Sequence, residues 1–334
     1  MTAATSTIDR RTGGPSTLVA RVMRRNSWTV ALFAALALLL IFTKAISPAY
    51  GASGLESLAK AALPVAFAAV AQAVVVISGG VDLSIGPMMA LTNVIAARLM
   101  AGGSDQLAVG VVISVLLIGV LLGVVNGTLA VITRVPDIVV TLAMSFVWSG
   151  AALLVLGSPG GSAAGWLKSL TEGSIVVPGF SSALVVLVVF VAIVWIPIER
   201  SRFGLSIYAV GSDRLAAFRS GVPVARTRIG AYAVAGLFAG AGGLALTMAT
   251  GIGTPIPGPY TLLGIAAVVL GGVSLAGGRG GLVGPLVAVF ILRLVRTDLT
   301  FLGVNQNYTT VVEGAIMVVV VMVGAYLTLR RART

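Results

Sequence analysis

The sequence predicts an all-α integral membrane protein, a polytopic bundle of about ten transmembrane helices with both termini in the cytoplasm. The 334-residue chain is 58% hydrophobic and only 10% charged, with a mean hydropathy of +1.08. This composition is typical of membrane proteins and not of soluble domains. Apolar runs that can cross a ~30 Å hydrocarbon core, which takes about 20 helical residues, also recur along the chain.

Residues 1–27 form a basic segment without an apolar run, so we expect a flexible cytoplasmic tail. Its basic residues are Arg10, Arg11, Arg21, Arg24 and Arg25. The Arg10-Arg11 pair resembles a twin-arginine export signal, but the first apolar run begins much later, near Trp28, and further spans follow it. We therefore interpret the tail as a determinant of membrane orientation.

Ten apolar runs follow the tail. We place them at 28–46, 58–78, 83–101, 107–133, 137–157, 178–198, 229–250, 261–277, 281–296 and 309–329. The third, eighth and ninth are short, and one of them is a candidate re-entrant segment. Together they define a transmembrane domain over residues 28–329, followed by a short cytoplasmic tail at 330–334.

The distribution of basic residues indicates the orientation. With the N-terminus inside, 16 of the 22 Lys and Arg residues lie on the cytoplasmic side and six on the outer side. An excess of basic residues in cytoplasmic loops is the rule in membrane proteins, and it favours N-in and C-in. Arg293 and Arg296 fit least well, because arginines near the end of a short span need an interface or a polar cavity. The formal net charge of +12 thus has a topological explanation and does not indicate nucleic-acid binding.

The longest polar interval, residues 199–228, separates two apolar halves and contains a short predicted helix at 213–220. Ser212 or Asp213 can cap its N-terminus, Gly221 can take the left-handed C′ position, and Pro223 prevents continuation. Two apolar side chains, Leu215 and Phe218, share one face. We therefore expect this helix to rest against an apolar surface.

A weak internal repeat links two glycine-containing segments. Gly79-Gly80-Val81-Asp82-Leu83-Ser84-Ile85-Gly86 is echoed by Gly271-Gly272-Val273-Ser274-Leu275-Ala276-Gly277. Glycine-interrupted helices in matching positions line the pathway in many transporters, whereas paired glycines elsewhere only allow close helix packing. Both interpretations stay open for Gly271 and Gly272.

Several polar residues on the predicted spans are candidates for contact with a solute. Asp82 is a candidate pathway residue and also a candidate cap of the helix that begins near Leu83, and one residue can fill both roles. The further candidates are Gln72, Gly79, Gly80, Ser84, Asn93, Asn126, Gly271, Gly272 and Ser274. Their amides and hydroxyls could meet sugar hydroxyls, or they could form interhelical hydrogen bonds, which contribute about 0.6 kcal/mol each in membranes.

Residues for several kinds of chemistry are missing. The chain has no His and no Cys, which excludes imidazole metal ligands, histidine bases and thiolate chemistry. It has no phosphate-binding loop, no HExxH and no Gly-x-Ser-x-Gly elbow. We expect no catalytic site, no metal and no cofactor.

Three segments are predicted on the outer side, at residues 158–177, 251–260 and 297–308. The prolines and glycines of 251–260 suggest a structured rim. These segments are candidate docking surfaces for an extracytoplasmic partner, or they are plain solvated connectors.

The chain from about residue 28 onward resembles the membrane permease subunits of ribose-type carbohydrate ABC importers. Residues 76–86 are similar to the family's Gly-Gly-Ile-Asp-Leu-Ser-x-Gly motif, residues 266–278 match a second motif, and residues 209–222 resemble the cytoplasmic segment that couples permease to ATPase. The Glu-Ala-Ala pattern of such segments reads Arg214-Leu215-Ala216 here, with Gly221 retained. The resemblance implies that Asp213, Arg214, Leu215, Ala216, Phe218 and Gly221 form an ATPase-coupling helix.

The resemblance also implies a function and a set of partners. The chain would be a non-enzymatic permease subunit in a bacterial inner membrane, importing a monosaccharide such as ribose or a related sugar. Its partners would be an ABC ATPase subunit, an extracytoplasmic substrate-binding protein and a second permease chain, identical or related. Two alternatives stay open: a stand-alone secondary carrier driven by an ion gradient, and a basic loop that only anchors the chain to anionic membrane lipid.

Overall fold

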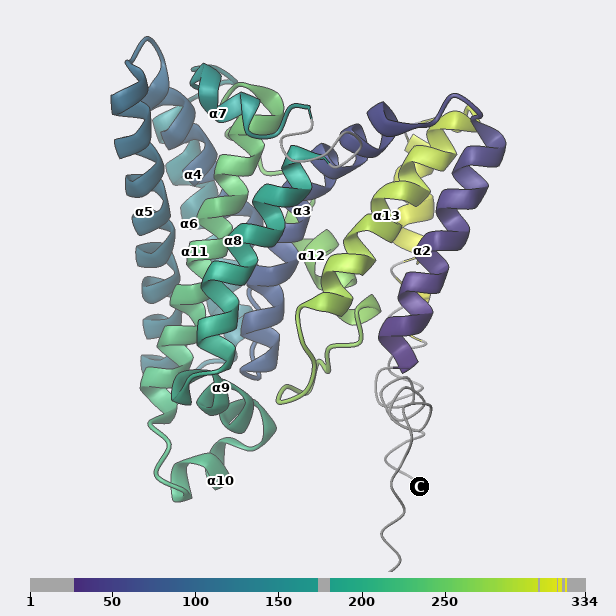
Figure 1. The fold of residues 1–334 in the computed structure, drawn as a ribbon. Coiled ribbons are helices and arrows are strands. Elements are labelled where there is room, and N and C mark those ends of the chain that lie inside the picture. Colours follow the sequence, from purple (N-terminus) through teal and green to yellow (C-terminus); the bar gives the residue numbers. More distant parts are fainter. Residues whose placement is uncertain (1–26, 174–180, 306, 317, 320–321, 323–334) are drawn as a thin grey trace, which may run out of the picture.

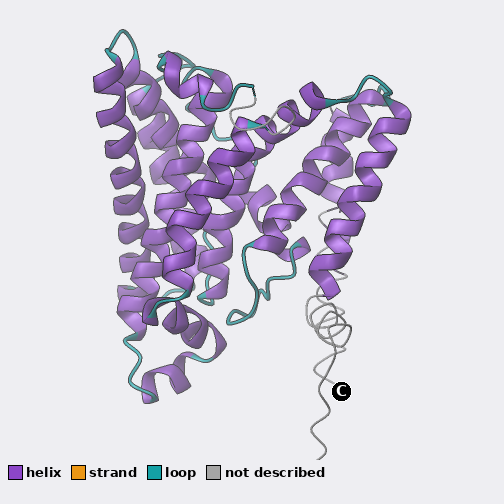
Figure 2. Ribbon diagram, viewed as in Figure 1, coloured by secondary structure: helices purple, strands orange, loops and turns teal. Residues whose placement is uncertain are grey.

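The computed structural model describes residues 27–173, 181–305, 307–316, 318–319 and 322, and this part of the chain is helical (Figures 1 and 2). A single isolated β-bridge joins Gly160 and Gly253 in the described residues. The helices are α2 (Ser27–Ile46), α3 (Ala52–Ile77), α4 (Ile85–Met100), α5 (Asp105–Ile132), α6 (Asp137–Val155), α7 (Gly165–Ser169), α8 (Ser182–Glu199), α9 (Arg202–Ser212), α10 (Arg214–Arg219), α11 (Val224–Thr250), α12 (Tyr260–Leu270) and α13 (Val283–Phe301).

Six of these helices are long and apolar enough to cross a membrane: α2, α3, α5, α6, α8 and α11. They confirm the predicted class, an all-α polytopic membrane protein. Two further apolar helices are shorter, because α4 has 16 residues and α12 has 11. The number of ten spans and the N-in, C-in orientation stay predictions. The tails at 1–26 and 330–334 lie outside the described residues.

The core is built around α3, which is buried along most of its length. Its C-terminal two thirds consist mainly of Ala and Val, whose small side chains let neighbouring helices approach. The most extensive interface between two helices joins α5 and α11, where glycines of each helix face the backbone of the other. A Cβ added at Gly123 would lie 2.1 Å from the Tyr232 carbonyl oxygen, and one at Gly236 would lie 2.1 Å from the Gly119 carbonyl oxygen.

The two halves of the internal repeat end their first helix in the same way. Gly79 has φ +82° after α3, and Gly272 has φ +80° after α12. In both turns the following amide bonds back five residues, from Gly80 N to Val75 O and from Val273 N to Val268 O. The sequence alignment pairs Gly79 with Gly271, whereas the backbone pairs it with Gly272. The structural repeat is therefore shifted by one residue.

The segment 251–260, predicted as a structured rim on the outer side, begins beside the other predicted outer segment, because the Gly160 amide donates to the Gly253 carbonyl at 3.0 Å. Its later residues turn toward α4. The Thr254 amide donates to Asn93 Oδ1 of α4 at 2.7 Å. Further along, the Gly258 carbonyl oxygen would lie 3.7 Å from a Cβ at Gly86, at the beginning of α4. The segment thus follows α4 inward, so that α12 begins beside the beginning of α4, where the Gly86 amide donates to Thr261 Oγ1 at 2.9 Å. Non-helical backbone at membrane depth is tolerated where protein surrounds it.

α2 and α13 lie side by side at one edge of the molecule (Figure 1). Thr43 Oγ1 of α2 donates to Asp298 Oδ1 of α13 at 2.7 Å. The two arginines that fit the predicted topology least well are both on α13. Arg296 forms an ion pair with Glu313 at 3.4 Å, which accounts for one of them. The Arg293 Nε is buried without a hydrogen-bond partner among the described residues.

Candidate functional site

The short helix α10 projects at one end of the molecule, beside α9 (Figure 1). Asp213 caps it, because its Oδ1 accepts hydrogen bonds from the amides of Leu215 at 2.8 Å and Ala216 at 2.9 Å. Gly221 has φ +82°, and the Val222 amide closes the turn on the Ala217 carbonyl at 3.0 Å. The predicted helix and both of its ends are confirmed, with Asp213 as the capping residue.

The larger apolar side chains of α10 are exposed in the described part of the chain. Leu215 is 57% exposed and Phe218 is 68% exposed, and Ala216 is also exposed. Only 5% of the Ala217 surface is exposed, so this residue faces the chain. Phe218 also borders a cavity of about 800 Å³ between α10 and the ends of α5 and α11. The expected apolar surface against which Leu215 and Phe218 rest is therefore not in the described part of this chain.

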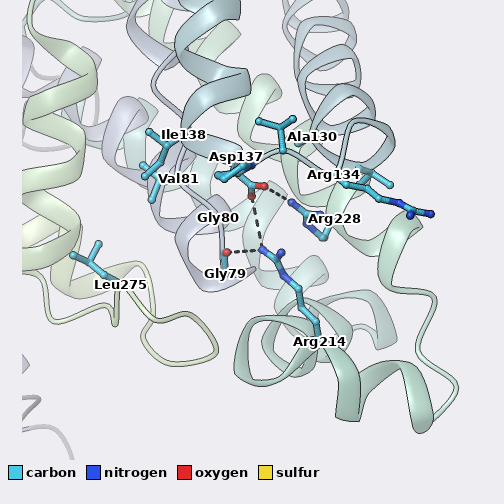
Figure 3. Close-up of a pocket in the computed structure, with 13 residues that line it drawn as sticks. Gly79, Gly80, Val81, Ala130, Arg134, Asp137, Ile138, Arg214, Arg228 and Leu275 are labelled. Atoms are coloured by element: carbon cyan, nitrogen blue, oxygen red, sulfur yellow. Dashed lines mark hydrogen bonds and ion pairs between the residues drawn. The ribbon is translucent and has the colours of Figure 1, made fainter.

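Arg214, in contrast, turns inward (Figure 3). Its Nη2 donates to the Gly79 carbonyl oxygen at 2.7 Å and lies 3.9 Å from Asp137 Oδ2. Arg214 thus contacts its own chain. It links α10 to the turn that ends α3.

Asp137 is the carboxylate on which these contacts converge. It is the first residue of α6, and its Oδ1 pairs with Arg228 Nη2 of α11. Its Oδ2 accepts a hydrogen bond from the Tyr232 hydroxyl at 3.1 Å. Gly80 packs on the same carboxylate, since an added Cβ would lie 2.4 Å from Oδ2. Asp137, Arg228 and Gly80 line a cavity of about 550 Å³, and Arg134, at φ +58°, also borders it.

Sequence reasoning did not assign Asp137, Arg228 or Tyr232 to the site. In the sequence, Asp137 is only the first residue of the predicted span at 137–157. The Arg228 and Asp137 positions are 91 residues apart, so their pairing has no local signal. The sequence offers one indication of this pair. Asp137 begins one predicted span and Arg228 directly precedes another, and both positions are predicted on the cytoplasmic side.

Tyr208 of α9 makes a second contact to a loop, because its hydroxyl donates to the Gly280 carbonyl oxygen at 3.1 Å. Burial raises the pKa of Tyr208, and the nearby Glu199 carboxylate raises it further. The hydroxyl therefore stays protonated and keeps its donor at physiological pH.

A second polar cluster lies inside the bundle. It is beside the turn at Gly79 and Gly80 that ends α3, which we call the first helix break. Asp82 is 1% exposed, and its Oδ1 accepts from the amide and the hydroxyl of Ser84, each at 2.7 Å. Asn126 of α5 donates through Nδ2 to Ser84 Oγ at 2.6 Å and accepts from Trp148 Nε1 at 3.2 Å. Asp82 holds the turn before α4, whose first residue is Ile85, while Ser84 is the N-cap.

The remaining pathway candidates differ in how their polar groups are satisfied. Asn93 is fully engaged, since it donates to Thr247 Oγ1 at 2.8 Å and accepts from the Thr254 amide. Gln72 is fully buried, and neither of its amide atoms has a hydrogen-bond partner in the described residues. Ser274 is half-buried in the α12–α13 connection, where its amide donates to the Arg279 carbonyl at 3.1 Å.

The turn at Gly271 and Gly272 that ends α12 is the second helix break. One of its glycines allows close packing, and the other allows the chain to turn. A Cβ at Gly271 would lie 2.2 Å from Pro285 N, so this glycine allows the two sides of the break to touch. Gly272 supplies the left-handed turn and faces Trp28, whose Nε1 donates to the Leu270 carbonyl at 2.8 Å. Close packing thus accounts for both glycines geometrically, and a pathway role stays a prediction.

Within the described residues, no group of three or more Asp, Glu, His or Cys side chains could hold a metal ion. The site is therefore made of an outward apolar face on α10, an inward charged cluster around Asp137, and a buried polar cluster around Asp82.

Comparison with known proteins finds similarity to transport permeases. The family described as "Branched-chain amino acid transport system / permease component" matches residues 54–321. The chain is 32% identical over 267 residues to the ribose import permease protein RbsC of Escherichia coli (strain K12), covering 77% of this chain and 81% of that protein. It is 31% identical over 260 residues to RbsC of Bacillus subtilis (strain 168), covering 74% and 77%. It is 27% identical over 322 residues to the autoinducer 2 import system permease protein LsrD of Escherichia coli O9:H4 (strain HS), covering 92% and 94%. No solved structure matches the chain.

Proposed function

This chain belongs to the family of branched-chain amino acid transport system permease components, and on that premise we propose that it is the permease subunit of an ATP-driven importer. It forms the passage for a small polar solute, a monosaccharide such as ribose or a related sugar. A separate ABC ATPase supplies the energy, and an extracytoplasmic binding protein delivers the solute. A second permease chain, identical or related, completes the passage.

The outward apolar face of α10 is the observation that carries this proposal. A capped helix of six residues that exposes both Leu215 and Phe218 to water is unfavourable unless a partner covers these side chains. Asp213 and Gly221 fix the two ends of the helix, so the face is presented in one orientation. We therefore assign Leu215 and Phe218 to the ATPase contact, while Ala216 allows close approach.

The polar candidates inside the bundle support a passage for a hydroxyl-rich solute. Gln72 carries an amide without a partner among the described residues, and Asp82, Ser84 and Asn126 form a cluster beside the helix break. Buried amides and carboxylates suit sugar hydroxyls, which both donate and accept. The named relatives import ribose and autoinducer 2, and this supports a sugar-like solute here.

The proposal is tested by reconstituting the chain in proteoliposomes with candidate ABC ATPases and sugar-binding proteins from the same organism. We expect uptake of labelled ribose, or of another sugar in a panel, that needs internal ATP. Uptake that ignores ATP but collapses with the ion gradient would instead establish a secondary carrier. Binding of the purified 199–228 loop to anionic vesicles, with no ATPase association, would reduce that loop to a lipid anchor.

One variant tests the assigned contact directly. Phe218→Asp places a charge on the outward face, and we expect the ATPase no longer to co-purify with the permease. Leu302→Asp is the matched control, because Leu302 is 56% exposed and directly follows α13, in the segment predicted on the outer side. Equal recovery of ATPase with both variants would contradict the assignment of Phe218.

A further inference from the structure

Three turns from distant parts of the chain meet in direct backbone contact beside α10. They are the end of α3 at Ile77, the end of α9 at Gly211, and the turn at Gly277–Gly278 between α12 and α13. A Cβ added at Gly211 would lie 1.8 Å from the Ile77 carbonyl oxygen, and one at Gly277 would lie 2.6 Å from the Gly211 carbonyl oxygen. The Gly278 amide also donates to the Ile77 carbonyl at 2.9 Å. We call these four residues the glycine junction.

Two side chains, one from α9 and one from α10, donate hydrogen bonds to backbone carbonyls next to the glycine junction. Arg214, the first residue of α10, donates to the Gly79 carbonyl at the first helix break. Tyr208 of α9 donates to the Gly280 carbonyl, just beyond the second break. Only Asp213 separates Gly211–Ser212 from α10. The connection is therefore too short for α10 to move far without moving the glycine junction.

Two of the three turns, the one after α3 and the one after α12, follow helices in matching halves of the internal repeat. The first leads through Gly80 to Asp82 and Ser84, the buried polar cluster. The second joins α12 to α13. Closely packed backbone does not deform continuously, so a displacement of one turn must move the others. In transporters with such repeats, discontinuous helices border the solute site.

We propose that Gly211 and Arg214 are positioning residues that lock α10 to both helix breaks, so that the breaks move together with α10 when the ATPase changes state. This inference rests on the proposed function. Leu215 and Phe218 receive the movement on the outward face, and Gly211 and Arg214 pass it inward. The two roles divide α10 into a docking face and a transmitting face.

The first test measures how much solute enters for each ATP hydrolysed. Gly211→Ala forces Ile77 away from α9, and Arg214→Gln removes the charged bond to Gly79. We expect both variants to keep the ATPase bound and hydrolysing, while uptake per ATP falls about five-fold or more, the range of typical coupling energies. Arg214→Lys should retain part of the coupling.

The matched control is Gly281→Ala, because Gly281 follows the second turn and an added Cβ there meets no atom within 4 Å. Its uptake per ATP should equal that of the unmodified chain. Unchanged ratios in Gly211→Ala and Arg214→Gln would overturn the inference. If the unmodified chain itself shows no ATP-driven uptake, the proposed function fails first, and the two failures are thereby distinguished.

A second test follows movement and does not depend on the stability of Gly211→Ala. The chain has no cysteine, so spin labels can be placed at exposed positions. We expect the distance between labels at Arg219→Cys and Ala276→Cys to stay constant between nucleotide-free and ATP-trapped complexes. The distance from Arg219→Cys to Thr300→Cys should change. A change of about 5 Å or more in the first pair, the size of a one-turn shift, would overturn the inference.

Discussion

Asp137 holds two arginines from different helices, and its removal should affect stability more than the loss of a surface charge pair. The Arg228–Asp137 pair is almost buried, with side chains 11% and 9% exposed. We predict that Asp137→Asn lowers the free energy of unfolding by about 3 kcal/mol, because Arg228 then keeps a buried charge without its carboxylate. The measurement is thermal denaturation of the purified chain in detergent.

The matched control for Asp137→Asn is Glu172→Gln, which breaks the exposed Lys60–Glu172 pair at 3.3 Å. Exposed pairs contribute about 0–1 kcal/mol, so its melting temperature should barely change. Equal shifts in both variants would show that the Asp137 cluster is solvated in the protein. Arg228 would then be free to serve another contact.

A substitution at Gln72 can distinguish an effect on stability from an effect on sugar uptake. A buried amide without hydrogen bonds costs about 1–3 kcal/mol, so we predict that Gln72→Leu raises the melting temperature. Because the amide is a proposed solute contact, we predict that the same variant lowers sugar uptake. Asn93→Leu is the contrasting control, since it breaks bonds to Thr247 and Thr254 and should lower stability. A stabilised Gln72→Leu with normal uptake would remove Gln72 from the pathway.

Local signals at single residues were readable from the sequence, and distant pairings were not. The spacing of Asp213, Gly221 and Pro223 predicts both ends of α10, because caps depend on residues within a few positions. The inward turn of Arg214 depends on Gly79, 135 residues away. No periodicity or motif carries that information, so Asp137 and Arg228 were also missed.

At the scale of elements, the α5–α11 contact depends on glycines that let the two backbones touch. We predict that Gly123→Ala destabilises the chain by about 1–3 kcal/mol, because its Cβ would meet the Tyr232 carbonyl. Gly110→Ala on the same helix is the control, with no atom within 4 Å of the new Cβ. That control should be neutral or slightly stabilising, since Ala favours helix over Gly. Melting temperatures in detergent compare the two, and a harmless Gly123→Ala would show that α5 and α11 can separate.

Long apolar runs predicted their helices well, whereas interrupted ones did not. Residues 261–277 were predicted as one span, but α12 stops at Leu270 because Gly272 adopts a left-handed turn. Residues 251–260 were predicted as a structured rim on the outer side, since their prolines and glycines cannot continue a helix. The inward turn from Thr254 onward depends on Asn93 of α4, whose Oδ1 accepts a hydrogen bond from the Thr254 amide. Polar residues on apolar helices were the overlooked sign of an inward segment.

At the scale of the whole molecule, the comparisons confirm the predicted resemblance to ribose-type importer permeases and the location in a bacterial cell membrane. Motifs around Asp82 and Gly271 carried that identification, because they cover both halves of the repeat. The α2 helix begins toward the same end of the molecule as α10 (Figure 1). The Trp28–Leu270 hydrogen bond fixes that end of α2 beside the second break. This agrees with a tail and a central loop that share one side of the membrane.

Which side that is can be decided by labelling a chain that has no cysteine of its own. The excess of basic residues predicts that α10 faces the cytoplasm and α7 the outside. We expect a membrane-impermeant maleimide to label Lys168→Cys in intact spheroplasts, and to label Arg219→Cys only after the membrane is opened. Labelling of Arg219→Cys from outside would reverse the orientation. It would also place the outward face of α10 where no cytoplasmic ATPase could reach it, so this measurement constrains the docking assignment as well as the topology.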